Sequence, residues 1–142
     1  MFQVRDLMTT PVFSLKETDS LFRARNLMDL QRIRHIPILT ADNRFAGLVT
    51  HRDILAATIS RLAELGPETQ KELDEGIPIR EIMRVGITTV TASTTLGEAA
   101  TILLRHKYGC LPVVEDERLV GILTEADFLR LTISLLQAVD AR

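Results

Sequence analysis

The chain has 142 residues and a formal net charge of −2 at pH 7, with 17 Lys and Arg residues against 19 Asp and Glu residues. This balance lacks the basic excess that a nonspecific nucleic-acid surface requires, so we expect no nucleic-acid partner. No apolar run approaches the ~20 residues that span a bilayer, and the N-terminus lacks a secretory signal, so we expect no membrane insertion. The single cysteine, Cys110, cannot form an internal disulfide, and a cytoplasmic location is the simplest expectation.

The first half of the chain predicts two helices and three short strands. An amphipathic helix follows the capping run Thr18–Ser20, because apolar residues recur on one side of it, while Arg23 and Arg25 fall on the opposite, solvated side. Pro37 interrupts an apolar strand and therefore places that strand at an edge or beside a bulge. The expected elements are a helical turn at 4–8, a strand at 12–15, a helix at 21–30, strands at 35–39 and 45–49 joined by a turn at 42–43, and a helix at 51–65.

The second half of the chain repeats the first. VRDLM at 4–8 corresponds to IREIM 75 residues later, and the spacing falls to 74 from Gly47 and Gly121 onward. The lost residue falls in a turn, where a deletion is tolerated, whereas a slip inside a strand would reverse its faces. The predicted domains are a first repeat at 1–66, an acidic linker at 67–78 that we expect to be solvated, and a second repeat at 79–142.

Each repeat contains an apolar strand that runs through Gly into Thr, followed by a helix with an Asp on its first turn. The two copies are GLVTHRD at 47–53 and GILTEAD at 121–127. A hydroxyl, free helix N–H groups and a carboxylate would gather at one helix N-terminus, and this grouping can hold a phosphate and a ribose. The same Thr-x-x-Asp spacing also caps a helix, and both roles can coexist.

These motifs resemble those of a tandem pair of cystathionine-beta-synthase (CBS) domains, also called a Bateman module. The resemblance rests on an ordered set that occurs twice. The set is VRDLM at 4–8, HIP at 35–37 and GLVTHRD at 47–53, then IREIM at 79–83, CLP at 110–112 and GILTEAD at 121–127. The resemblance implies an α+β fold of two pseudo-twofold-related repeats, each a small sheet of about three strands packed by two helices.

The resemblance also implies a function. It implies a regulatory ligand-binding module, because members of the family commonly bind adenosine-containing ligands in clefts between the two repeats. We expect a stand-alone sensor with no required cofactor, whose first candidate ligands are AMP, ADP and ATP, with S-adenosylmethionine as another. Its signal would pass to an effector protein that the sequence does not name. The apolar faces of the last helix in each repeat, together with the resemblance, predict a homodimer.

Site residues follow from the resemblance one by one. Asp53 and Asp127 would accept hydrogen bonds from ribose hydroxyls, while Thr50 and Thr124 would contact phosphate. The residues implied for the adenine pocket are Val49, Leu123, Ile36, Pro37, Leu111 and Pro112, and the segments leading into the first strand of each repeat add Thr10, Val12 and Ile87.

Positive charge distinguishes the first repeat from the second. Phosphate binding needs positive potential beyond that of one helix end. The corresponding positions are Arg34, His35, His51 and Arg52 in the first repeat and Gly109, Cys110, Glu125 and Ala126 in the second. We therefore expect the first site to favour a charged nucleotide and the second to take a less anionic ligand or stay empty.

Other classes of function have less support in the sequence. The alternative to a sensor is a structural dimerisation scaffold with a vestigial pocket, and the two intact Thr-x-x-Asp motifs count against it. We expect no enzyme and no catalytic residue, because the chain shows no nucleophile–base set, metal cluster or phosphate loop. His35, His51 and His106 lack partners at metal-ligand spacing, so no metal site is predicted. Cys110 is expected to be a small buried hydrophobe.

Overall fold

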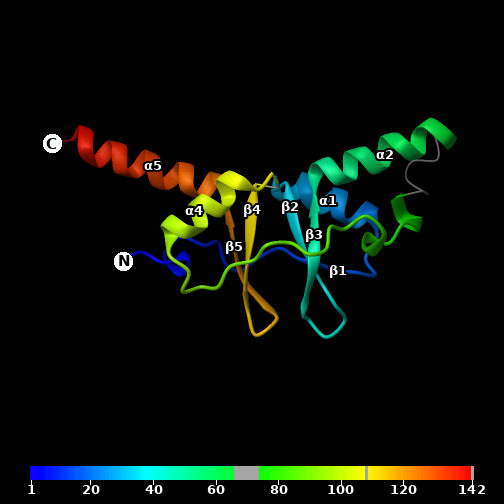
Figure 1. Cartoon of the computed structure of the whole chain (residues 1–142). Helices are drawn as coiled ribbons and strands as arrows, with labels where there is room; N and C mark the ends of the chain where they lie inside the picture. Colours follow the sequence, from blue (N-terminus) through cyan, green and yellow to red (C-terminus); the bar gives the residue numbers. More distant parts are fainter. Residues whose placement is uncertain (66–73, 108, 142) are drawn as a thin grey trace. The chain divides into compact units, whose positions relative to one another are not determined.

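The computed structural model describes residues 1–65, 74–107 and 109–141. The chain divides into two compact units: unit 1 contains Met1–Val12 and Thr88–Arg142, and unit 2 contains Phe13–Ile87 (Figure 1). Helices combine with small sheets of two and three strands, which confirms the predicted α+β class. The sequence repeats and the compact units divide the chain at different places, because the segment that begins each repeat packs with the sheet of the other. We call residues 1–12 the first lead-in segment and residues 74–87 the second.

Unit 2 contains a three-stranded sheet with two helices. Its elements are β1 (Leu15–Lys16), α1 (Leu21–Gln31), β2 (His35–Leu39), β3 (Phe45–Thr50), α2 (His51–Leu65) and the 3-10 turn η3 (Ile79–Glu81). Helix α1 begins where Ser20 Oγ accepts a hydrogen bond from the Arg23 N–H, as the capping run predicts. The turn between β2 and β3 places Asn43 at a φ of 67°, a left-handed conformation that Asn tolerates.

Strand β2 lies between β1 and β3, parallel to the first and antiparallel to the second. Pro37 is accommodated because β1 pairs only with Ile38 and Leu39, so the ladder stops before the residue that lacks an N–H. The β2–β3 register also shifts between Ile38 and Leu39, just after Pro37. Of the two predicted alternatives, the bulge is therefore confirmed, whereas the edge position is wrong because β2 is the central strand. Of the strand expected at 12–15, only Leu15 lies in a strand, because β1 is limited to Leu15–Lys16.

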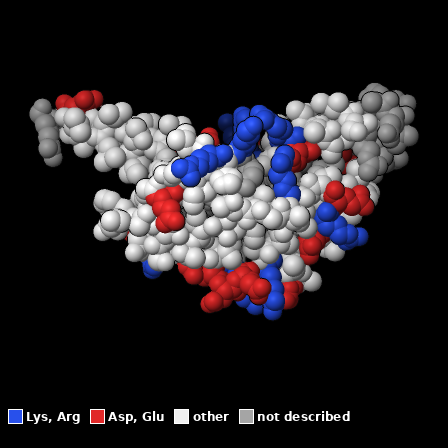
Figure 2. Space-filling view, viewed as in Figure 1, with Lys and Arg blue, Asp and Glu red and all other residues white. Residues whose placement is uncertain are grey.

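Unit 1 contains a two-stranded hairpin with two helices. Its elements are η1 (Val4–Asp6), α4 (Leu96–Arg105), β4 (Cys110–Glu115), β5 (Arg118–Thr124) and α5 (Glu125–Asp140). Acidic atoms gather at the tip of this hairpin, where the sequence has Glu115 to Glu117 (Figure 2). The sequence repeat also predicts a strand at 87–90, equivalent to the one expected at 12–15, and this prediction is wrong because Val90 forms only an isolated bridge with Val113. Pro112 lacks the N–H that would extend this parallel ladder, so the pairing stops there.

Each unit has its own apolar core, and each core includes residues of a lead-in segment. In unit 2, Ile77 and Ile79 pack with buried residues of α1, β2, β3 and α2. In unit 1, Val4 packs with buried residues of α4, β4 and β5. Val4 and Ile79 are fully buried, so apolar burial fixes each lead-in segment to the sheet of the other repeat.

The end of the expected linker is not solvated. Asp74 is buried and forms an ion pair with Arg25 of α1, with Arg25 Nε 2.9 Å from Asp74 Oδ2. Arg25 also donates to the hydroxyl of Thr58 in α2. The prediction of a solvated position is therefore wrong for Asp74 and for Arg25, because each satisfies the other's charge beneath the helix pair. Residues 67–73 of the linker lie outside the described residues.

Candidate functional site

The first Thr-x-x-Asp motif forms the junction between β3 and α2. The Thr50 N–H donates to Asp53 Oδ2 at 3.1 Å, and the Asp53 N–H donates back to Thr50 Oγ1 at 3.1 Å. Thr50 is buried, whereas Asp53 is half-buried on the first turn of the helix. Each side chain satisfies a backbone N–H at the helix start, which is the capping role that the spacing predicts.

The second motif repeats this geometry at the junction between β5 and α5. The Thr124 N–H donates to Asp127 Oδ2 at 2.9 Å, and the Asp127 N–H donates to Thr124 Oγ1 at 3.3 Å. The Thr124 hydroxyl also lies 3.2 Å from Asp127 Oδ2. Asp127 is buried, so this carboxylate is more enclosed than that of Asp53.

A lead-in segment runs beside each motif and pairs with the strand that leads to it. In unit 2, the Arg84 N–H donates to the Leu48 carbonyl at 2.8 Å, and the Leu48 N–H donates to the Arg84 carbonyl at 3.0 Å. In unit 1, Thr9 and Ile122 exchange the same two bonds at 2.8 and 3.1 Å. Thr9 and Arg84 are 75 residues apart and thus equivalent in the repeat. The two units therefore share this backbone pairing, but the lead-in residue is Arg84 in unit 2 and Thr9 in unit 1.

Glycine is required where the lead-in segment crosses the strand in unit 2. A Cβ added to Gly47 would lie 2.5 Å from the Arg84 carbonyl oxygen, a backbone atom that cannot move alone. A Cβ added to Gly121 would lie 2.5 Å from Met8 Sδ, which belongs to a flexible side chain. The glycine of each repeated motif thus serves the close approach of the other repeat's lead-in segment.

The two Asp carboxylates have different further partners. Arg84 Nε lies 2.9 and 3.1 Å from the two oxygens of Asp53, and Arg84 Nη2 lies 2.8 Å from Oδ1. Asp127 Oδ1 accepts from the Thr9 hydroxyl at 3.3 Å and from Arg130 Nη2 at 2.7 Å. The first carboxylate is thus held by a two-oxygen arginine fork, and the second by a hydroxyl and a single guanidinium contact.

The arginine fork lowers the pKa of Asp53. Burial by itself raises the pKa of this carboxyl, but hydrogen bonds from Arg84 and Thr50 and the charge of Arg84 outweigh that effect. The pKa of Asp53 therefore lies below its ordinary value of 3.8. The carboxylate is ionised at neutral pH and can accept hydrogen bonds from a ligand once its present donors move.

The residues predicted to contact adenine are all buried. They are Ile36, Pro37, Val49, Leu111, Pro112 and Leu123. Ile36 faces Val49 across β2 and β3, and Leu111 faces Leu123 across β4 and β5. These four side chains are fully buried, so they hold the strands beneath the motifs and present no surface of their own in this structure.

The predicted site residues of the lead-in segments belong to different units. Thr10 and Val12 belong to unit 1, together with Thr124 and Asp127. Ile87 belongs to unit 2, together with Thr50 and Asp53. Thr10 is exposed, whereas Val12 and Ile87 are half-buried.

Three residues that contact the motifs were missed in the sequence: Thr9, Arg84 and Arg130. Arg130 lies three positions after Asp127 on α5, and this helical spacing is a signal that could have found it. Thr9 and Arg84 directly precede the segments that the sequence singled out. Nothing local indicates that these residues reach the motif of the other repeat.

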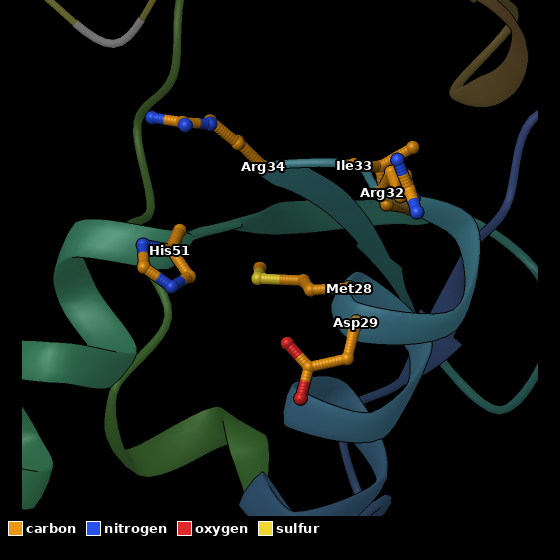
Figure 3. Close-up of a pocket in the computed structure, with 6 residues that line it drawn as sticks. All are labelled: Met28, Asp29, Arg32, Ile33, Arg34 and His51. Atoms are coloured by element: carbon orange, nitrogen blue, oxygen red, sulfur yellow. The ribbon is translucent and has the colours of Figure 1, made fainter.

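The basic residues predicted for the first repeat lie around the start of α2. His35 pairs with Thr50 across the sheet, and the His51 N–H donates to the Arg34 carbonyl at 2.9 Å. A hollow of about 260 Å³ lies here, lined by Met28, Asp29, Arg32, Ile33, Arg34 and His51. The Met28 side chain points toward His51 (Figure 3). Arg52 is exposed on the first turn of α2. The structure thus brings Arg34, His35 and His51 to one end of unit 2.

Cys110 is buried, as predicted. Burial, with an added contribution from the charge of Glu125, raises the pKa of its thiol to about 12. The thiol is therefore protonated at neutral pH and is a poor nucleophile. Within residues 1–65, 74–107 and 109–141, no group of three or more His, Cys, Asp or Glu side chains is placed to hold a metal ion.

The repeated geometry matches a known family. The family model for the CBS domain matches residues 4–60 and again residues 79–134. The chain is a tandem pair of CBS domains. The part of the chain that the structure describes contains no helix with the length and hydropathy needed to span a membrane.

Curated relatives of this CBS pair differ in length. Hypoxic response protein 1 of Mycobacterium tuberculosis is 32% identical over 130 residues, which cover 92% of this chain and 85% of that protein. An uncharacterised protein of Methanocaldococcus jannaschii, MJ1225, is 28% identical over 128 residues, which cover 90% of this chain and 42% of that protein. The chain thus spans less than half the length of some relatives.

Solved structures share the fold over nearly the whole chain. The Vibrio cholerae protein AcuB has a TM-score of 0.86 and 37% identity, covering 99% of this chain and 98% of that one. CBSX2 in complex with AMP has a TM-score of 0.79 and 28% identity, covering 95% and 98%. The CBS pair of MJ0100, in complex with 5′-methylthioadenosine and S-adenosylmethionine, has a TM-score of 0.78 and 25% identity, covering 94% and 98%.

Proposed function

We propose that this CBS pair is a regulatory module that binds an adenosine-containing ligand and signals to an effector protein. AMP, ADP and ATP are its first candidate ligands, and S-adenosylmethionine is the next. The observation that carries the proposal is the duplicated Thr-x-x-Asp junction, where a carboxylate and a hydroxyl lie together at a helix start. Structural relatives in complex with AMP and with S-adenosylmethionine support the ligand class.

Each junction offers the groups that a nucleotide needs. The carboxylate of Asp53 or Asp127 would accept both ribose hydroxyls, as a charged acceptor suited to two neighbouring donors. The hydroxyl of Thr50 or Thr124 and the N-terminal end of the following helix would face a phosphate. A ligand that binds one conformation of these groups more tightly than another would increase the population of that conformation, and the effector would respond to the change.

The two sites are expected to differ in charge preference. Arg34, Arg52 and Arg84 add positive charge around the first junction, whereas the second has Arg130 beside Asp127 and Glu125 directly after Thr124. Positive groups favour phosphate and a carboxylate disfavours it, so AMP should bind more tightly at the first site. Equal affinity of AMP for the two sites would contradict this assignment.

Calorimetric titration of ligand-stripped protein with AMP, ADP, ATP and S-adenosylmethionine tests the proposal. Hydrogen bonds to a charged acceptor are worth about 1.5–3 kcal/mol, so Asp53→Ala should weaken nucleotide binding by roughly ten- to a hundredfold. Asp127→Ala provides the matched variant of the other site. Saturable binding that one of these changes weakens, with the fold intact by circular dichroism, supports the sensor. No binding of any of the four ligands overturns it.

A structural dimerisation scaffold is the second candidate function. It is favoured by exposed apolar side chains on α2 and α5, which include Leu55, Ile59, Leu129, Ile133, Leu136 and Val139. The visible face of α5 carries few charged atoms before its C-terminal end (Figure 2). Such faces are suited to self-association as a homodimer. A scaffold would dimerise but bind none of the four ligands.

A further inference from the structure

The Arg84 side chain occupies the Asp53 carboxylate, to which the ribose of a ligand would have to bind. The ion pair of Arg84 with Asp53 occupies both carboxylate oxygens, and Asp53 Oδ2 also accepts from the Thr50 N–H. A carboxylate has about four acceptor positions. Three N–H donors already reach this carboxylate, two from Arg84 and one from the Thr50 backbone, and they leave room for at most one more. Two ribose hydroxyls therefore cannot both bind Asp53 while Arg84 stays in place.

The Arg84 side chain can move without disturbing the fold around it. Its backbone is fixed to Leu48 by two hydrogen bonds, whereas its side chain is 51% exposed and that of Asp53 is 11% exposed. A long, solvent-facing guanidinium on an anchored backbone can swing between partners at little structural cost. The anchor keeps the guanidinium close to the junction in either position.

The equivalent residue of the other repeat cannot act in this way. Thr9 is neutral, and its hydroxyl contacts Asp127 at 3.3 Å, so it offers no charge to a ligand. The cation at that junction is Arg130, which makes one contact with Asp127 from the same helix and has a 68% exposed side chain. The two junctions thus differ in whether the carboxylate is covered by an arginine fork from a lead-in segment.

We propose that Arg84 is a specificity-determining residue of the first site, which selects phosphate-bearing nucleotides over uncharged nucleosides. A nucleoside has to displace the guanidinium from Asp53 and gives it no new partner. A nucleotide displaces it equally but supplies a phosphate, with which arginine pairs strongly. This inference rests on the proposed function and adds the residue that makes the first site prefer a ligand with a phosphate.

The test compares AMP with adenosine at the first site alone. Calorimetry in an Asp127→Ala background isolates this site, and Arg84→Thr gives it the residue of the second repeat. We expect the ratio of AMP affinity to adenosine affinity to fall by roughly ten- to a hundredfold in Arg84→Thr, because charge-assisted contacts to phosphate are lost. The decrease of AMP affinity with added salt should also become shallower.

Two further variants separate specificity from stability. Arg84→Lys keeps the charge but loses the fork, and should retain most of the preference for AMP. Thr9→Arg in an Asp53→Ala background should raise the preference for AMP at the second site. If Arg84 only forms a structural ion pair, Arg84→Thr would lower the affinities for AMP and for adenosine together and leave their ratio unchanged.

The outcomes distinguish the two proposals. AMP binding that needs Asp53 but shows the same AMP-to-adenosine ratio with Arg, Lys or Thr at position 84 overturns the role of Arg84 and leaves the sensor standing. Absence of AMP and adenosine binding to the unchanged protein overturns the sensor, and the role of Arg84 falls with it.

Discussion

Arg84 binds both carboxylate oxygens of Asp53, although the sequence repeat assigns the two residues to different halves of the chain. The backbone of Arg84 also pairs with Leu48, which precedes the motif by two residues. Each Thr-x-x-Asp junction is thus completed by the lead-in segment of the other repeat. A separated repeat would lose this segment, so neither half of the chain contains a complete junction.

The Arg84–Asp53 pair predicts a specific dependence of stability on pH. The pKa of Asp53 in the folded protein lies below its ordinary value of 3.8, so the ionised form is favoured by folding. This contribution is complete above the unfolded value and is lost as pH falls through the lowered folded value. Arg84→Gln should cost about 0.5–1 kcal/mol at neutral pH, since the pair is partly exposed and screened. The loss of unfolding free energy caused by Arg84→Gln should decrease as pH falls below 3.8.

Urea unfolding between pH 7 and pH 3 measures this effect. Arg80→Gln is the matched control, because Arg80 lies on the same lead-in segment and is exposed. The control should show no comparable change of its cost with pH. A cost for Arg84→Gln that stays constant through the acid range would show that the ion pair with Asp53 is not its source.

The two motif glycines predict unequal effects of the same substitution. Gly47→Ala places a Cβ 2.5 Å from the Arg84 carbonyl oxygen, so the second lead-in segment must shift. Overpacking of this kind costs about 1–3 kcal/mol. Gly121→Ala meets Met8 Sδ at 2.5 Å, and the Met8 side chain can change rotamer, so the loss should be smaller.

Thermal and urea unfolding of both glycine variants checks this order. Gly47→Ala should also weaken AMP binding at the first site, because it moves the backbone that carries Arg84. Equal losses of stability, or a larger loss for Gly121→Ala, would contradict the proposed role of the lead-in carbonyl.

Local relationships were predictable from the sequence. Thr50 and Asp53 lie three residues apart, and the strand-to-helix pattern alone places them at one helix start. The turn at Asn43 and the bulge beside Pro37 follow from the backbone preferences of those residues. These features depend on neighbours in the chain, which a sequence displays directly.

Long-range relationships were not predictable in the same way. Arg84 contacts Asp53 across 31 residues of sequence, and Thr9 contacts Asp127 across 118. The lead-in segments carry no helical or strand periodicity over their short lengths, so their partners are set by the burial of Val4 and Ile79. An internal repeat shows which residues are equivalent, but it does not show which copy of a sheet each segment joins.

The buried ion pair of unit 2 predicts a large stability loss on removal of one partner. Asp74→Ala leaves the charge of Arg25 half-buried without its carboxylate, which should cost about 2–3 kcal/mol. The double variant Arg25→Met with Asp74→Leu removes both charges and should be more stable than Asp74→Ala alone. Urea unfolding of the single and double variants measures the difference. A double variant less stable than Asp74→Ala would contradict the explanation by an unpaired charge.

The exposed apolar side chains of α5 predict a homodimer that one charge disrupts. Ile133 is 54% exposed in the single chain, and burying it in a dimer would contribute up to about 1.5–3 kcal/mol per copy. Ile133→Glu removes that gain and adds a carboxylate that the interface would have to desolvate, so the dimer should dissociate. Ser134→Glu is the matched control, since it introduces the same charge one residue along the helix at another exposed position. Sedimentation velocity should show a dimer for the unchanged protein and for Ser134→Glu, and a monomer for Ile133→Glu. A monomeric unchanged protein at all concentrations would exclude this face as a self-association surface, whereas a dimer that survives Ile133→Glu would place the interface elsewhere.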